Sequence, residues 1–135
     1  MVAALFAGAA VYVSVAEHPA RLSLDDRAAL TQWKLAYAYG AVMQASLAIV
    51  GFLLGILAWW QSGRWLWLIG AIVLLANWPY TLIGIMSTNR QLKDTDPATA
   101  GPQTRALLEK WGALHAMRSA LGFASMLVFL WALMR

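Results

Sequence analysis

Four apolar stretches dominate this sequence and constrain what it can fold into. They run over Val2 to Ala16, Leu35 to Trp60, Trp65 to Met86 and Leu107 to Met134. The last three are long enough to cross roughly 30 Å of hydrocarbon at about 1.5 Å per residue of helix. Of the 135 residues, 61% are hydrophobic and 12% are charged, whereas about a quarter are charged in a typical soluble domain. The composition therefore predicts one integral membrane domain, residues 1–135, whose solvent is the lipid bilayer.

The first apolar stretch is the shortest and ends at His18-Pro19. The residue before a proline is disfavoured in a helix, so we predict that the first helix ends near residue 18. A secretory signal peptide is the alternative for this stretch. No Lys or Arg precedes it, as such a peptide would require, and a spanning helix is therefore favoured.

The connections between the stretches indicate how the helices are arranged. Residues 61–64 join the second and third stretches so closely that these must form an antiparallel hairpin. A longer loop, residues 93–103, precedes the fourth, where Pro102 suits a first helical turn. We predict an all-α, up-down-up-down bundle of four transmembrane helices, at about residues 1–18, 26–60, 65–91 and 103–134.

In this topology one end of the bundle contains the end of the first helix and the start of the second. The end of the third helix and the start of the fourth lie there too, and we call it the site end. Seven basic residues lie there and two at the opposite end: Arg21, Arg27, Lys34, Arg90, Lys93, Arg105 and Lys110 against Arg64 and Arg135. The positive-inside rule therefore places the site end in the cytoplasm, with the inner membrane of a bacterium as the expected location. No basic block of the kind that binds nucleic acid is present, and homo-oligomerisation is left open.

Polar and aromatic side chains recur near the site end of every helix. Those of the second and fourth helices are spaced three or four residues apart, as on one helical face. The candidates are Glu17 and His18 in the first helix, Trp33, Tyr37 and Gln44 in the second, Asn77, Trp78, Tyr80 and Asn89 in the third, and Trp111, His115 and Arg118 in the fourth. Pro79 removes a backbone donor within the third helix and predicts a kink that opens space beside Asn77.

Ionisable groups inside a membrane indicate function by default. The alternative is that polar residues hold the helices together, with Glu17 and Arg118 forming a buried ion pair of structural value only. That alternative is favoured for Gln44. Function is favoured for the two His residues, since one ion pair would not require them, and the aromatic candidates are either pocket walls or packing.

The sequence resembles the anthrone oxygenase-like family of small four-helix membrane proteins. The resemblance is carried by Glu17-His18-Pro19-Ala20-Arg21, by Gln32-Trp33-Lys34 with Tyr37 and Gln44, by Asn77-Trp78-Pro79-Tyr80-Thr81 followed by Asn89, and by Trp111-Gly112-x2-His115-x2-Arg118. Fungal members are linked to the oxidation of a polyketide anthrone to an anthraquinone by O₂. The resemblance implies a monooxygenase-type oxidoreductase acting on a flat hydrophobic phenol or anthrone, with Glu17, His18, Asn77, Asn89, His115 and Arg118 in its site.

Such a substrate has an acidic CH₂ group flanked by aryl rings. A base, His115 or His18, would remove a proton while Arg118 stabilises the oxygen that gains negative charge, and Glu17 would orient a histidine. Such a reaction could proceed without a cofactor.

Three other hypotheses stay open. Glu17, His18 and His115 could bind iron or copper as two histidines and a carboxylate, or the two histidines could ligate a haem. The chain could instead be a non-enzymatic binder or carrier of a lipophilic quinone or phenol. It could also be a purely structural membrane subunit.

Overall fold

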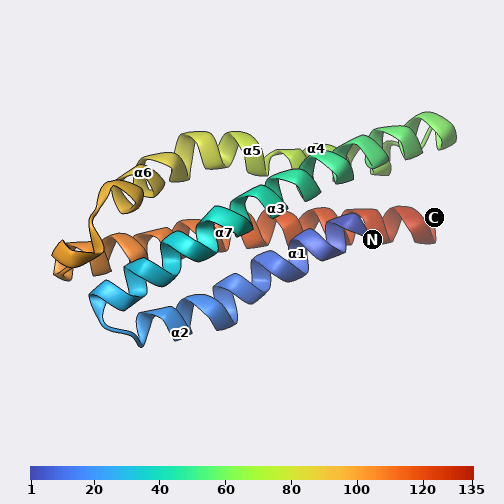
Figure 1. Cartoon of the computed structure of the whole chain (residues 1–135). Coiled ribbons are helices and arrows are strands. Elements are labelled where there is room, and N and C mark those ends of the chain that lie inside the picture. The colour runs from blue at the N-terminus through green and yellow to red at the C-terminus, as the bar shows by residue number, and fades with distance from the viewer.

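The computed structural model describes all 135 residues as four long helical rods (Figure 1). The first rod contains α1 (Val2–Tyr12), the π-helical turn η1 (Val13–Glu17) and α2 (His18–Leu22), and the second is α3 (Asp26–Ser62). The third contains α4 (Trp65–Leu75), α5 (Asn77–Tyr80), the π-helical turn η2 (Thr81–Ile85) and α6 (Met86–Asp94), and a 3₁₀ turn, η3 (Pro97–Thr99), leads to α7 (Pro102–Met134). All four rods are long and apolar enough to cross a membrane. The predicted all-α four-helix bundle is confirmed.

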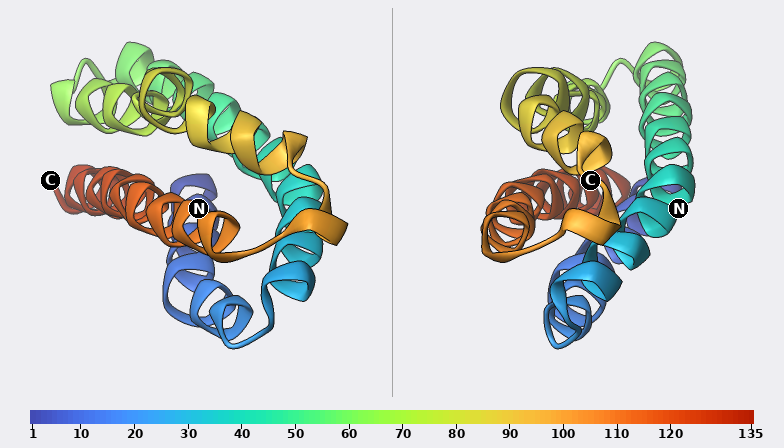
Figure 2. Two further views of the ribbon diagram at one scale, coloured as in Figure 1. Left: turned by 90° about the vertical axis from the view of Figure 1, so that its left-hand side faces the viewer. Right: turned by 60° about the vertical axis from the view of Figure 1, so that its left-hand side comes forward.

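The rods alternate in direction, and each packs on two neighbours. α1 packs on α3 and α7, and α4 packs on the same two helices from the other side. Both termini lie at one end of the bundle together with the α3 to α4 connection, while the α2 to α3 turn and η3 lie at the site end (Figure 1). At that end η3 lies against α3 before α7 begins (Figure 2).

Local signals explain where α3 begins and ends. The Asp25 carboxylate accepts a hydrogen bond of 2.9 Å from the Ala28 amide and so caps the first turn. At the other end Gly63 adopts φ 67°, a left-handed conformation that glycine takes without steric cost. This glycine allows the tight hairpin between α3 and α4.

The prediction that the first helix ends near residue 18 is wrong, because the rod continues to Leu22. Just before the proline, the His18 amide donates to the Val13 carbonyl, five residues back, which makes a wide π-helical turn. Pro19 then lies in the first turn of α2, where a missing amide hydrogen is tolerated. The pre-proline preference is a bias that this wider turn overcomes.

The third rod is interrupted as Pro79 predicts. α4 ends at Leu75, Ala76 lies outside the regular helix, and η2 follows α5. Each of the two interrupted rods therefore carries one π-helical turn, a feature that is frequent at functional sites.

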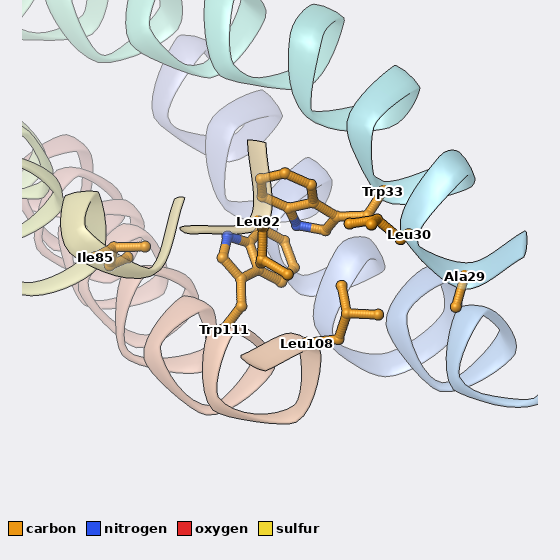
Figure 3. Close-up of a cluster of buried hydrophobic side chains, with 7 residues drawn as sticks. All are labelled: Ala29, Leu30, Trp33, Ile85, Leu92, Leu108 and Trp111. Carbon is orange, nitrogen blue, oxygen red and sulfur yellow. The ribbon is translucent and has the colours of Figure 1, made fainter. Parts of the chain in front are cut away.

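Two clusters of buried apolar side chains form the core. The cluster at the site end contains Ala29, Leu30, Trp33, Ile85, Leu92, Leu108 and Trp111 (Figure 3). The other contains Ala3, Phe6, Ala10, Ala48 and Leu74. Glycines let the helices approach there: a Cβ built on Gly55 would lie 2.7 Å from the Ala71 Cβ. The Gly51-x3-Gly55 motif thus packs helices closely, as small residues do in membranes.

Candidate functional site

Two cavities lie between the rods toward the site end. The first has a volume of about 260 Å³ and the second about 170 Å³. Tyr37, Ala41, Gln44 and Arg118 line both. The Arg118 side chain therefore belongs to the region where the two cavities meet.

Most of the predicted site residues line a cavity. Glu17, Trp33, Tyr37, Gln44, Asn89, Trp111, His115 and Arg118 line the first, and Asn77 and Trp78 line the second together with Tyr37, Gln44 and Arg118. His18 and Tyr80 line neither. The Tyr80 hydroxyl donates to the Leu114 carbonyl at 3.0 Å, so this residue joins the third rod to α7.

Arg118 has no carboxylate partner. Its Nη2 donates to Gln44 Oε1 at 3.0 Å, and its buried Nε has no partner. The Glu17–Arg118 ion pair of the structural alternative is not formed, because the Glu17 carboxylate accepts from Arg21, one turn along the same helix. The Arg118 guanidinium therefore lies next to both cavities without a carboxylate to neutralise it.

Arg21 lines the first cavity but was not among the predicted site residues, although it belongs to the Glu17-to-Arg21 motif. It is 2% exposed. Its guanidinium donates to Gln32 Oε1 and Glu17 Oε1, and at 3.2 Å to His18 Nδ1. The spacing of four residues from Glu17 was the signal that could have found it. Because arginine only donates, His18 Nδ1 is an acceptor and the hydrogen of the neutral ring lies on Nε2.

His115 takes the opposite tautomer. Ser119 Oγ donates its one hydrogen to a backbone carbonyl, that of Ala10 at 2.8 Å, and therefore accepts from Ser14 Oγ, also at 2.8 Å. Ser14 Oγ must then accept from His115 Nδ1, at 3.2 Å. A neutral His115 has Nε2 free as an acceptor. Ser14, and not Glu17, orients this histidine.

The predicted two-histidine, one-carboxylate metal site is not formed. No group of three or more His, Cys, Asp or Glu side chains is placed to hold a metal ion. Glu17 and His18 both face the Arg21 guanidinium instead. The rings of His18 and His115 both contact Trp111, at centroid distances of 5.5 and 4.8 Å, so each ring packs on this indole. Glu17, His18 and His115 therefore do not fit an iron or copper ion held by all three.

Three buried polar side-chain atoms lack a hydrogen-bond partner, and all three belong to cavity-lining residues. They are Trp33 Nε1 at the first cavity, Asn77 Oδ1 at the second, and Arg118 Nε at both. The Asn77 amide orientation is fixed, because Nδ2 donates to the Leu74 carbonyl at 3.1 Å. Buried polar groups are nearly always paired in proteins, so these three atoms are exceptions, and they lie beneath the cavity surfaces rather than open to the cavities.

Both cavities reach the lateral surface of the bundle. Tyr12 and Met43 line the first cavity and are 60% and 48% exposed, and Leu82, which lines the second, is 57% exposed. These residues lie within the rods that are apolar enough to cross a membrane. A molecule dissolved in the bilayer would therefore reach either cavity without passing through water.

Long apolar helices, aromatic cavity walls, a free imidazole acceptor and a cation without a carboxylate partner define a class: four-helix membrane proteins with cavities between their helices. The family model described as anthrone oxygenase matches residues 33–128. The chain belongs to the anthrone oxygenase family, which confirms the resemblance seen in its motifs. No curated protein and no solved structure matched the chain. The matched segment begins at Trp33, so Glu17 and Arg21 lie outside it.

Proposed function

We propose that this protein is a membrane-embedded oxygenase that oxidises a flat, hydrophobic phenol or anthrone with O₂ in the first cavity. One observation carries the proposal: the His115 imidazole, with Nε2 free to accept a proton, lines the same apolar cavity as the unpaired Arg118 guanidinium. Membership of the anthrone oxygenase family supports the reaction type.

The proposed reaction balances without an added electron donor. His115 removes a proton from the CH₂ group, and the negative charge spreads to the ring carbonyl oxygen, where Arg118 stabilises it. The anion transfers electrons to O₂ and a C–O bond forms, giving a hydroperoxide. Loss of the second C–H proton then breaks the O–O bond. The sum is R₂CH₂ + O₂ → R₂C=O + H₂O, in which the CH₂ carbon supplies all four electrons.

We further propose a route for the substrate, a location for the protein and a type of substrate. The substrate enters from the bilayer through the lateral openings of the cavities. We propose that the site end lies in the cytoplasm, which the excess of basic residues there supports, and that the membrane is the inner membrane of a bacterium. A polyketide is the substrate type suggested by the fungal relatives that the motifs resemble.

Oxygen consumption by the purified protein in detergent, with anthrone added, tests this function. Wild-type protein should consume O₂ above the rate of heat-denatured protein, with one anthraquinone formed per O₂. His115→Gln should remove the enzymatic rate, because the amide cannot serve as the base. His18→Gln is the matched control and should retain most of the rate, since His18 lines neither cavity. Full activity of His115→Gln would contradict the proposal.

A non-enzymatic binder of a lipophilic quinone or phenol is the second candidate. It is favoured by the two cavities, both lined by Tyr37 and Arg118, which can hold a ligand without any reaction. Saturable binding of anthrone with no O₂ consumption above background would support this candidate over the oxygenase.

A further inference from the structure

A chain of hydrogen bonds links three rods beside the cavities. Trp111 Nε1 of α7 donates to Asn89 Oδ1 of α6 at 2.9 Å, and Asn89 Nδ2 lies 3.1 Å from the Tyr37 hydroxyl of α3. Asn89 is 1% exposed, so neither bond competes with solvent. The chain ends at Tyr37, which lines both cavities.

The direction of every bond in this chain is fixed. An indole N–H can only donate, so the Asn89 oxygen must face Trp111 and the amide nitrogen must face Tyr37. An amide nitrogen also only donates, so the Tyr37 oxygen accepts. Asn89 is the sole protein partner of the Tyr37 hydroxyl, whose own hydrogen is therefore free to donate to something else.

The Tyr37 ring is held firmly in place. It stacks on Trp33, with the ring centroids 4.8 Å apart and the planes 21° from parallel. Lys93 Nζ lies 4.6 Å from the ring centroid on the outer side of the site. A hydroxyl on such a ring is preorganised, which is what stabilisation of a developing charge requires.

We propose that the Tyr37 hydroxyl and the Arg118 guanidinium together form a two-donor site for one oxygen atom, the carbonyl oxygen of an aryl ketone. Both residues line both cavities. The Tyr37 hydroxyl hydrogen has no protein acceptor, and the Arg118 guanidinium makes one hydrogen bond, from Nη2 to Gln44, which leaves its Nη1 free to donate. Asn89 and Trp111 are positioning residues that direct the Tyr37 hydrogen toward the ligand. The proposal rests on the proposed function, because this oxygen is the one that gains charge when His115 removes the proton.

The two hydrogen-bond chains define the ligand chemistry. The Ser119 and Ser14 chain leaves an acceptor at His115, whereas the Trp111 and Asn89 chain leaves a donor at Tyr37. A ligand that satisfies both has an acidic hydrogen and a ketone oxygen. A plain polycyclic hydrocarbon satisfies neither and should bind more weakly.

The test uses 9-fluorenone, a flat tricyclic ketone with no CH₂ group to oxidise, and fluorene, which has no oxygen. Infrared spectroscopy of bound fluorenone reports the hydrogen bonds to its carbonyl. In wild-type protein the carbonyl stretch should lie below its position in an apolar solvent. Tyr37→Phe removes one donor and keeps the ring, so the stretch should move back toward the apolar value. Fluorenone affinity should fall about tenfold while fluorene affinity stays unchanged.

Asn89→Asp tests the orientation of the hydroxyl. An aspartate oxygen still accepts from Trp111, but the other oxygen now accepts from Tyr37 and takes the hydrogen away from the ligand. This variant should reproduce the Tyr37→Phe spectrum. Tyr80→Phe is the matched control, since its hydroxyl is used at Leu114 outside the cavities.

An unchanged carbonyl stretch in Tyr37→Phe would overturn the proposal. Loss of the shift in Tyr37→Phe but not in a folded Asn89→Asp would overturn the role of Asn89. Because fluorenone is not oxidised, these outcomes are independent of turnover. A protein that shows the shifts but consumes no O₂ with anthrone would retain the two-donor site and lose the proposed oxygenase function.

Discussion

The closest approach between the first rod and α7 offers a sharp test of the packing. A Cβ built on Gly112 would overlap with Nε2 and Cδ2 of His18 and would lie 3.0 Å from Cε1. Ordinary van der Waals contact begins at 3.4 Å. The ring has little freedom to move, because His18 is 7% exposed and is held by the Arg21 guanidinium and by Trp111. Gly112→Ala should therefore force the first rod and α7 apart.

The expected cost follows from two opposing effects. Forcing an extra methyl group into a packed interior costs about 1–3 kcal/mol. Replacing glycine by alanine inside a helix returns roughly 0.5–1 kcal/mol. Gly112→Ala should therefore lower the free energy of unfolding by up to about 2.5 kcal/mol. At Gly8 no atom lies within 4 Å of the added Cβ. Gly8→Ala should therefore only raise the free energy of unfolding, by the roughly 0.5–1 kcal/mol that alanine gains over glycine in a helix.

The assay is reversible unfolding in mixed detergent micelles, arranged as a double-mutant cycle. In a His18→Ala background the imidazole is absent, so Gly112→Ala should now stabilise the protein by roughly 0.5–1 kcal/mol. The coupling between the two sites should therefore be about 1–3 kcal/mol. If Gly112→Ala has the same effect in both backgrounds, His18 does not occupy the space above Gly112 and the packing described for this end is refuted.

Three further predictions concern the site and its periphery. Ser14→Ala breaks the hydrogen-bond chain that holds the proton on His115 Nδ1. Anthrone turnover, measured by O₂ uptake, should then fall about tenfold while the protein stays folded. Ser14→Thr should restore the turnover. Arg118→Leu should reduce turnover by about 10²–10³-fold. The free energy of unfolding in micelles should stay unchanged or rise, because the substitution removes a buried cation that has no carboxylate partner. Gln61→Lys, at the exposed end of α3, should change neither quantity, and a loss of activity there would show that the opposite end contributes to the site.

The fold could be predicted because lipid leaves the chain few choices. Apolar stretches of spanning length must be helical, and a four-residue connection forces adjacent antiparallel helices. The spacing of Trp111, His115 and Arg118 on one helical face correctly placed these residues at a common cavity. The π-helical turn before Pro19 was not predictable, because it depends on how the first rod packs on its neighbours.

The partners of the charged groups were harder to predict. Glu17 was paired with Arg118 because both are ionisable groups in apolar segments, yet Arg21 is nearer along the chain and meets Glu17 one helical turn away. The two histidines looked equivalent in the sequence. Their different roles depend on whether the neighbour at Nδ1 donates, as Arg21 does, or accepts, as Ser14 does. Such directions follow from atomic contacts and leave no trace in residue spacing.

The uncompensated charge of Arg118 bears on how tightly the site should bind each species along the reaction. In the proposed reaction a neutral ketone would offer this cation only a dipole, whereas the anion formed by proton transfer to His115 would bring a full negative charge to the same oxygen. The interaction is therefore stronger after proton removal than before it, which lowers the barrier without trapping the substrate. The product is again neutral and loses the added attraction. On this reasoning a phenolate that mimics the anion should bind more tightly than the substrate or the product, and the difference should vanish in Arg118→Leu.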